Sequence, residues 1–278
     1  MKTKVSTITP SFKMEKYLKK FLEELPKQLY FSNLEVVLDH NEPTEKELSW
    51  VKEFQEKYPG KLKHIIVNPV EPIGTSMNRC IKEASGDYLT IWNVDDLRTP
   101  DSILKQAFLL DTHPECGVAN TNFLIVREFG ATVGQLVDHS QYPADSREFT
   151  RSMILGPFFM FRKSLLDRAG YFDEQLKSGA DFDLAVRLAV HSQKIYSTPG
   201  IGGYYLDEGK GASTNGDGRQ PTERTVIELR YGISDKVDQQ WVPKTKNYRV
   251  QEVCEYGKWR NIRELVPDYE GLVRTNGK

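Results

Sequence analysis

The N-terminal part of the chain alternates short apolar runs with segments whose apolar residues recur at helical spacing. Short apolar runs bounded by turn residues predict strands, and the helical spacing predicts helices. The expected strands are residues 5–9, 34–38, 62–67 and 88–92, and the expected helices are residues 13–25, 44–58, 75–84 and 101–111. Strict alternation of the two favours parallel strand pairing with helices on both faces of the sheet. The pattern predicts an α/β, Rossmann-like fold.

The second part of the chain has a less regular pattern. A glycine-rich stretch over residues 209–220 predicts a loop. The other elements expected there are a hairpin over 120–127 and 132–137, strands over 156–162, 194–198 and 202–206, and helices over 163–169, 180–191 and 221–232. We therefore expect one domain over residues 1–240, with halves 1–112 and 113–240, and a helical C-terminal extension over 241–278.

Composition narrows the functional class. The net charge is −1 and charges of both signs are interspersed, so no nucleic-acid partner is expected. The cysteines Cys80, Cys116 and Cys254 share no close spacing and are interpreted as reduced thiols. No signal segment and no uncharged apolar stretch of about 18 residues is visible. These features predict a soluble, cytoplasmic protein without a transmembrane segment.

The most informative polar segment is Asn93-Val94-Asp95-Asp96, which follows the fourth expected strand. In open α/β sheets, ligands bind at the carboxyl ends of the strands. Adjacent carboxylates there can hold Mg²⁺ or Mn²⁺ and leave positions open for substrate phosphates. The alternative is a solvated or capping pair of aspartates in a turn, which is the commoner role of such residues.

Polar segments also follow the first two expected strands, at residues 9–12 and 39–41. Carboxyl ends of parallel strands share one edge of the sheet, so these segments should meet the paired aspartates. Another acidic segment, residues 179–184, opens an expected helix in the second half. Asp181 in that segment could be a general base or only a helix N-cap, and Asp183 is equally capable of capping.

In this order and spacing, the motifs resemble those of family-2 glycosyltransferases of the GT-A fold. The resemblance runs from about residue 4 to residue 215. The matching segments are Val5–Phe12 and residues 36–39, 78–81, 86–88, 94–96, 170–174 and 181–184. The first half would then bind the nucleotide and the second half the acceptor.

The resemblance implies an inverting, metal-dependent glycosyltransferase that uses Mn²⁺ or Mg²⁺. It would move a sugar from a nucleotide-diphosphate sugar, with a UDP-sugar favoured, to a hydroxyl of a glycan or glycoconjugate, as in polysaccharide biosynthesis. Asp96 is the expected metal ligand and Asp181 the expected catalytic base. The expected donor-binding residues are Thr9, Pro10, Phe12, Asp39, Asn78, Asn93 and Asp95.

Five positions depart from the family pattern. His40 and Asn41 stand where Asp-Gly usually follows the aspartate that binds the nucleotide base. Asn93 stands where many relatives have a further Asp, and Cys80 replaces a Gly. Ala180 stands where a Glu commonly precedes the catalytic base, so this region has one carboxylate fewer.

Other functions remain open at this point. A sugar nucleotidyltransferase would need a glycine-rich basic loop after the first strand, and residues 9–13 contain no glycine. A haloacid-type phosphatase would need its nucleophilic Asp where Asn93 stands. A non-catalytic nucleotide-sugar-binding module is the third alternative.

Aromatic and basic residues of the C-terminal extension predict an interface with the body or with a second subunit as a homodimer: Trp241, Tyr248, Tyr256, Trp259 and Arg260.

Overall fold

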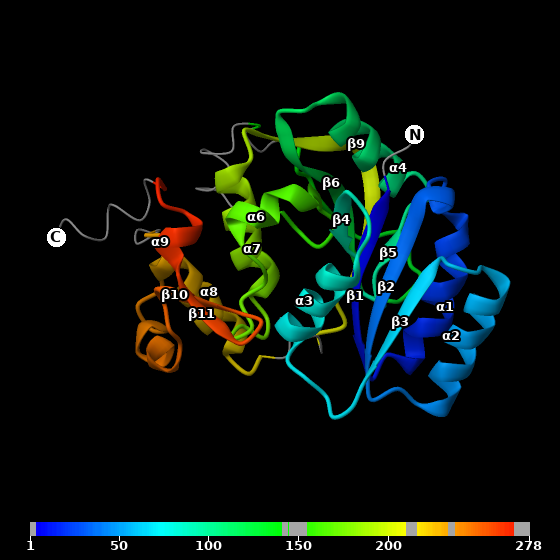
Figure 1. The fold of residues 1–278 in the computed structure, drawn as a ribbon, viewed down its shortest axis with the longest axis horizontal. Helices are drawn as coiled ribbons and strands as arrows, with labels where there is room; N and C mark the ends of the chain where they lie inside the picture. Colours follow the sequence, from blue (N-terminus) through cyan, green and yellow to red (C-terminus); the bar gives the residue numbers. More distant parts are fainter. Residues whose placement is uncertain (1–3, 141–143, 145–154, 210–215, 233–236, 270–278) are drawn as a thin grey trace.

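A computed structural model of the chain describes residues 4–140, 144, 155–209, 216–232 and 237–269. Its centre is a mixed sheet with the strand order β3-β2-β1-β4-β8-β6-β9-β5, and β7 pairs with β6 outside this path (Figure 1). No helix in the described ranges is both long enough and apolar enough to cross a membrane.

The first half forms the parallel part of the sheet, as the sequence pattern predicts. Strands β3, β2, β1 and β4 lie side by side in the same direction. The strands are β1 (Val5–Phe12), β2 (Leu34–Asn41), β3 (Leu62–Val67) and β4 (Tyr88–Ile91), and the helices are α1 (Glu15–Glu24), α2 (Glu45–Lys57), α3 (Ile73–Glu83) and α4 (Ser102–Thr112). Short 3₁₀ helices, η1 (Leu25–Lys27) and η2 (Phe31–Asn33), lead from α1 to β2.

Helices cover both faces of this sheet because side chains alternate between the faces along each strand. Val36 and Leu38 of β2 belong to the core that includes Phe21 of α1 and Val51 of α2. Val37 belongs to the opposite core, which includes residues of α3 and α7. Figure 1 shows α1 and α2 together on one side of the sheet and α3 on the other.

The second half adds antiparallel pairs to the sheet and one parallel pair, between β6 and β9. The predicted hairpin is confirmed as β6 (Cys116–Val126) and β7 (Gln135–Val137). The other strands of this half are β8 (Met160–Arg162) and β9 (Lys194–Leu206), and β5 (Leu97–Arg98) of the first half pairs with β9. β9 replaces the two strands expected over 194–198 and 202–206. The register against β6 shifts where Pro199 and Gly200 interrupt the pairing, and a bulge lets one strand continue past a proline.

The helices of the second half are close to their expected positions. They are η3 (Lys163–Leu165), α6 (Leu166–Ala169), α7 (Ala180–His191) and α8 (Arg219–Arg230). The loop expected over 209–220 lies partly outside the described residues, and its last two residues begin α8.

The prediction of a helical C-terminal extension is wrong for most of its described part. After the 3₁₀ helix η5 (Val242–Asn247), the chain forms a hairpin of β10 (Glu252–Glu255) and β11 (Lys258–Asn261) before the short helix α9 (Ile262–Leu265). Tyr256 and Gly257 form the two-residue turn with φ angles of 50° and 71°. Positive φ at both central residues is the requirement of a type I′ hairpin turn.

The C-terminal hairpin packs against the body of the protein. The Tyr256 hydroxyl donates to the Asn78 carbonyl oxygen at 3.0 Å, and the Tyr256 ring lies 5.0 Å from that of Tyr171. The Cys254 carbonyl accepts from the Glu174 N–H at 2.9 Å. These contacts give Tyr256 a partner in the body of the protein, and the homodimer remains a prediction.

Candidate active site

Asp39 lies at the carboxyl end of β2 and is fully buried. Pairing of β1 with β2 sets Pro10 beside Asp39 and Phe12 beside Asn41. The Asp39 carboxylate accepts from Arg79 Nη1 of α3 at 2.7 Å and from Asn41 Nδ2 at 2.8 Å. Burial raises the pKa of Asp39, and hydrogen bonds and the Arg79 charge oppose the rise. The carboxylate is therefore held rigidly at the sheet edge.

Thr9 and Asn78, both expected to bind the donor, have structural partners. The Thr9 hydroxyl is buried and lies 2.9 Å from that of Thr7. The Asn78 amide donates to the Phe172 carbonyl at 3.0 Å and accepts from the Phe172 N–H at 2.9 Å. Asn78 thereby fastens α3 to the segment that leads to α7. Pro10 and Phe12 are partly exposed, and their contact with a donor remains a prediction.

The two aspartates of the turn after β4 differ in how far their side chains are buried. Asp96 is only 2% exposed, and its carboxylate accepts from the Leu206 N–H and from Asn93 Nδ2, each at 3.1 Å. Asp95 is partly exposed. The geometry therefore favours Asp95 as the carboxylate that can reach a ligand, and it does not support Asp96 as the sole metal ligand.

A buried arginine lies behind this turn. The Arg98 guanidinium donates to the Thr90 hydroxyl at 2.7 Å, the Ile91 carbonyl at 2.9 Å and the Gln106 side-chain oxygen at 3.0 Å. Burial lowers the pKa of Arg98 to about 9, and the charge of Asp96 opposes this shift. Arg98 ties β4 and α4 together around the aspartate turn.

The acidic turn fits a divalent cation. Burial raises the pKa of Asp95, and the negative charge of Glu208 raises it further. Asp95 has no cationic side chain as a partner in the described part of the chain, so its charge is uncompensated. Within those same residues no cluster of three metal-ligating side chains exists. Mg²⁺ and Mn²⁺ suit such an open site, because they take only a few protein oxygens and complete their shell with water and substrate phosphates.

Asp181 lies in the first turn of α7 and is partly exposed. The helix is capped by Gly179 without a side-chain hydrogen bond, so the interpretation of Asp181 as the N-cap is wrong. Within the described ranges its carboxylate accepts only local backbone hydrogen bonds, including one of 2.8 Å from the Phe182 N–H. Burial raises the pKa of Asp181, and the nearby charge of Glu223 adds to this rise. Among the described residues it has no cationic partner, which suits a proton acceptor.

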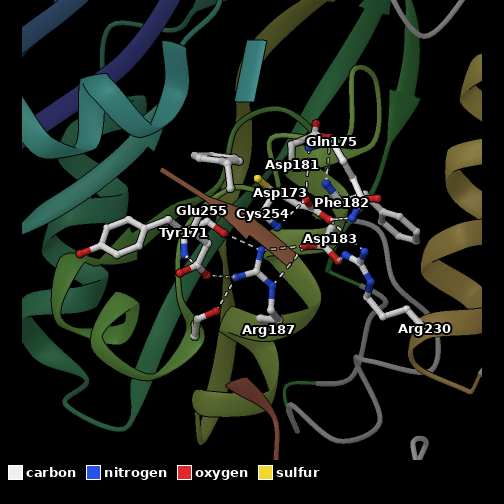
Figure 2. Close-up of polar contacts among 12 residues, drawn as sticks. Tyr171, Asp173, Gln175, Asp181, Phe182, Asp183, Arg187, Arg230, Cys254 and Glu255 are labelled. Carbon is white, nitrogen blue, oxygen red and sulfur yellow. Dashed lines mark hydrogen bonds and ion pairs between the residues drawn. The ribbon is translucent and has the colours of Figure 1, made fainter. Parts of the chain in front are cut away.

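Asp183, two residues further, has a structural role instead. Figure 2 shows it between the guanidinium groups of Arg187 and Arg230, at 2.7 Å and 2.6 Å. The Tyr231 hydroxyl also donates to it at 2.7 Å. Burial alone would raise the pKa of Asp183, but the two guanidinium groups outweigh it and hold the pKa below its usual range. Asp183 therefore is neither a cap nor free to accept a proton.

The same ion network reaches the C-terminal hairpin. Arg230 lies 2.9 Å from the Asp173 carboxylate, and its guanidinium donates to the Val250 and Glu252 carbonyl oxygens, each at 2.8 Å. Glu255 of β10 accepts from the Tyr171 N–H at 2.9 Å. Fully buried charges therefore join α7, α8 and the hairpin behind Asp181 (Figure 2).

Sequence reasoning missed Arg98, Arg187, Arg230 and Glu223. The spacing of Asp183 and Arg187, four residues apart on a helix, is a usable signal for an ion pair. Arg230 and Glu223 lie more than 40 residues from their α7 partners, and no local pattern indicates those contacts.

The fold and the acidic turn define a class of protein, and comparison with known proteins identifies it. Residues 6–170, more than half of the chain, match the family described as glycosyl transferase family 2. The chain therefore belongs to glycosyl transferase family 2, as the sequence motifs predict.

Proteins with similar sequences are also described as glycosyltransferases. The chain is 31% identical over 127 residues to EpsE, a putative glycosyltransferase of Bacillus subtilis, covering 46% of this chain and 45% of EpsE. It is 26% identical over 215 residues to TarS of Staphylococcus aureus, a poly(ribitol-phosphate) β-N-acetylglucosaminyltransferase, covering 75% of this chain and 36% of TarS. The chain thus spans less than half the length of these relatives.

Solved structures share the fold. TarS residues 1–349 in complex with UDP-GlcNAc matches with a TM-score of 0.67 and 22% identity, over 87% of this chain and 69% of that one. A mannosyltransferase of Pyrobaculum calidifontis, in complex with GDP-Man and Mn²⁺, matches with a TM-score of 0.60 and 18% identity, over 89% of this chain and 68% of that one. The GT-A-like architecture is confirmed.

Proposed function

We propose that this protein is an inverting, metal-dependent glycosyltransferase that moves a sugar from a UDP-sugar to a hydroxyl of a glycan or glycoconjugate. The observation that carries the proposal is Asp181, a partly exposed carboxylate without a cationic partner in the described residues, at the start of a helix anchored by buried charges. Family membership argues against the nucleotidyltransferase and phosphatase alternatives.

In this proposal Asp181 accepts the proton of the acceptor hydroxyl. The acceptor oxygen then forms a bond to the anomeric carbon while the bond from that carbon to the diphosphate oxygen breaks, which inverts the configuration. General-base help of this kind contributes typically about 10²–10⁴ in rate. The proton ends on Asp181 and the nucleoside diphosphate leaves with the electron pair of the broken bond.

A UDP-sugar is the favoured donor. The TarS structure that this fold resembles holds UDP-GlcNAc, whereas the mannosyltransferase holds GDP-Man, so structural likeness alone supports more than one nucleotide. Asp39, fixed at the strand end by Arg79 and Asn41, offers a carboxylate acceptor for the N–H of a uracil base. UDP-GlcNAc is the first donor to test.

Asp95 is the residue we propose to hold Mn²⁺ or Mg²⁺, with Asp96 and Asn93 fixing the turn from behind. The bound ion would act as a Lewis acid that neutralises charge on the leaving diphosphate. Leu206 contributes by binding Asp96 through its N–H, at 3.1 Å, so the end of β9 helps to shape the turn.

A thermal-shift screen tests the proposed function directly. UDP-GlcNAc, UDP-glucose and GDP-mannose are each added with and without Mn²⁺, and donors that shift the unfolding temperature are then assayed for nucleotide release with a panel of glycan acceptors. A ligand at a hundredfold excess over its Kd stabilises the folded state by about 2.7 kcal/mol. Binding of UDP-GlcNAc without turnover of any donor would instead support the non-catalytic binding module.

Asp95→Ala is expected to abolish Mn²⁺-dependent binding of UDP-GlcNAc with little change in stability, because its carboxylate is partly exposed and has no ion-pair partner among described residues. Asp96→Ala is expected to weaken binding and also to destabilise the fold by about 1–3 kcal/mol, since it leaves buried donors unpaired. Calorimetry and urea unfolding measure the two effects, with exposed Asp167→Ala as the control. Full activity of the wild type in EDTA, with metal verified absent, would contradict the metal assignment.

Asp39→Asn is expected to weaken UDP binding while leaving Mn²⁺ binding intact. A hydrogen bond to a charged group contributes roughly 1.5–3 kcal/mol, so the Kd should rise by about one to two orders of magnitude. Titration calorimetry with UDP and Mn²⁺ measures this change. Glu71→Gln is the control, because Glu71 is the other carboxylate bound to Arg79 but is not buried. Equal affinities for wild type and Asp39→Asn would place the base elsewhere.

A further inference from the structure

A single carboxylate from α8 binds the loop that leads into α7. Glu223 is fully buried, and its Oε2 accepts from the Ser178 N–H at 2.7 Å and from the Gly179 N–H at 2.9 Å. Its Oε1 accepts from the Lys177 N–H at 2.9 Å. The Tyr248 hydroxyl, at the end of η5, donates to Oε1 at 3.1 Å. Consecutive backbone N–H groups therefore converge on one side chain.

This carboxylate binds the N-cap residue and the two residues before it, whereas the N–H of Phe182 inside the first turn is bound by Asp181 itself. The first N–H groups at a helix start need an acceptor, which Ser, Thr, Asp or Asn usually provides at the N-cap. Here the N-cap is Gly179, which has no side chain. A Cβ atom at Gly179 would lie 3.1 Å from Ile227 Cδ1 and 3.3 Å from Glu223 Cβ, so α8 packs too closely for most side chains. Glu223 thus holds the segment that enters α7.

We propose that Glu223 is a positioning residue for the catalytic base, which fixes the loop that enters α7 and sets a second negative charge near Asp181. This inference rests on the proposed role of Asp181. The other groups around Glu223 are Tyr248, with Arg219 and Asp217 acting on that tyrosine, and the backbone of the exposed Lys177.

The effect of the Glu223 charge on the pKa of Asp181 has a predictable direction. Burial raises the pKa of Asp181, and the Glu223 charge raises it further because protonation of Asp181 relieves the repulsion. A carboxylate with a higher pKa is a stronger base. Loss of the Glu223 charge should therefore lower the pKa of Asp181, and the acidic limb of the turnover profile should move to lower pH.

Two substitutions separate charge from position. Glu223→Gln keeps the size but removes the charge and turns an amide donor toward backbone donors. Glu223→Asp keeps the charge but shortens the side chain. Both should lower kcat by about 10- to 100-fold, because a small displacement of a catalytic group is costly. Only Glu223→Gln should lower the pKa of Asp181. Glu228→Gln is the matched control, as a buried carboxylate of the same helix that pairs with Arg224.

The pKa is measured without substrate, by ¹³C NMR titration of protein labelled at the aspartate carboxyl carbons, with Asp181→Asn assigning the resonance. Turnover is measured as UDP release from UDP-GlcNAc with Mn²⁺ across pH. An unchanged Asp181 titration in Glu223→Gln, or unchanged kcat in Glu223→Asp, overturns the inference. If Asp181→Asn itself keeps wild-type turnover, the proposed base fails instead. If Glu223→Gln does not fold, a wild-type kcat and pH profile in Glu223→Asp overturns the positioning role, and a lowered kcat with an unmoved profile supports it.

Discussion

Asp181→Asn is expected to reduce turnover by about 10²–10⁴ while the fold and the affinity for the donor stay unchanged. The amide keeps the size of the side chain and can still accept the 2.8 Å hydrogen bond from the Phe182 N–H. It cannot take up a proton from the acceptor. Steady-state UDP release from UDP-GlcNAc, together with calorimetry for donor binding, measures both parts of the prediction.

The wild-type pH profile provides a second measurement at the same residue. Burial raises the pKa of Asp181 above the ordinary aspartate value of about 3.9. A general base works as the carboxylate, so turnover should rise with pH through that raised pKa and then level off. The acidic limb should accordingly lie above the range of an ordinary aspartate and should be absent from the residual activity of Asp181→Asn.

The control for Asp181→Asn is Asp167→Asn, an exposed position on α6. Asp183 lies only two residues after Asp181, but the structure places it within the buried ion network. Asp183→Asn should therefore act mainly on stability, and it is not a neutral control. A larger loss of turnover per folded molecule in Asp183→Asn than in Asp181→Asn would show that Asp181 is not the base.

Arg230→Met is expected to lower the free energy of unfolding by about 3–5 kcal/mol, as when one partner of a buried ion pair is removed. Arg230 is fully buried between Asp183 and Asp173, and its guanidinium also binds carbonyl oxygens of residues 249–252. Methionine fills a similar volume but leaves Asp173 without this charge and frees the C-terminal hairpin from α8. Urea unfolding measures the loss.

Arg224→Met tests whether the burial of Arg230 is the reason for the loss of stability in Arg230→Met. Arg224 lies on the same helix and pairs with Glu228 at 2.9 Å, but its side chain is 60% exposed. Glu228 is buried, but the Arg224 end of the pair is open to solvent, and pairs that solvent screens contribute at most about 1 kcal/mol. Arg224→Met should therefore change stability far less than Arg230→Met. Equal losses in the two variants would mean that the buried network does not stabilise the junction of α7, α8 and the hairpin.

The sequence by itself determines the parallel half of the sheet and the position of the acidic turn. Strand and helix periodicity, the capping box of Thr44 and Glu47, and the placement of Asp95 and Asp96 after an apolar strand are local properties. Local spacing fixes which face of an element a side chain occupies. These features were therefore predictable before any tertiary contact was known.

Only the tertiary structure decides which acidic residue has which environment. Asp95 and Asp96 are adjacent, yet the N–H of Leu206, 110 residues away, binds Asp96 and leaves Asp95 as the more accessible carboxylate. Asp181 and Asp183 differ because Arg230 reaches only Asp183 across 47 residues. Burial and charge pairing depend on which segments pack together, and packing of distant segments follows from the whole fold rather than from the spacing of neighbouring residues.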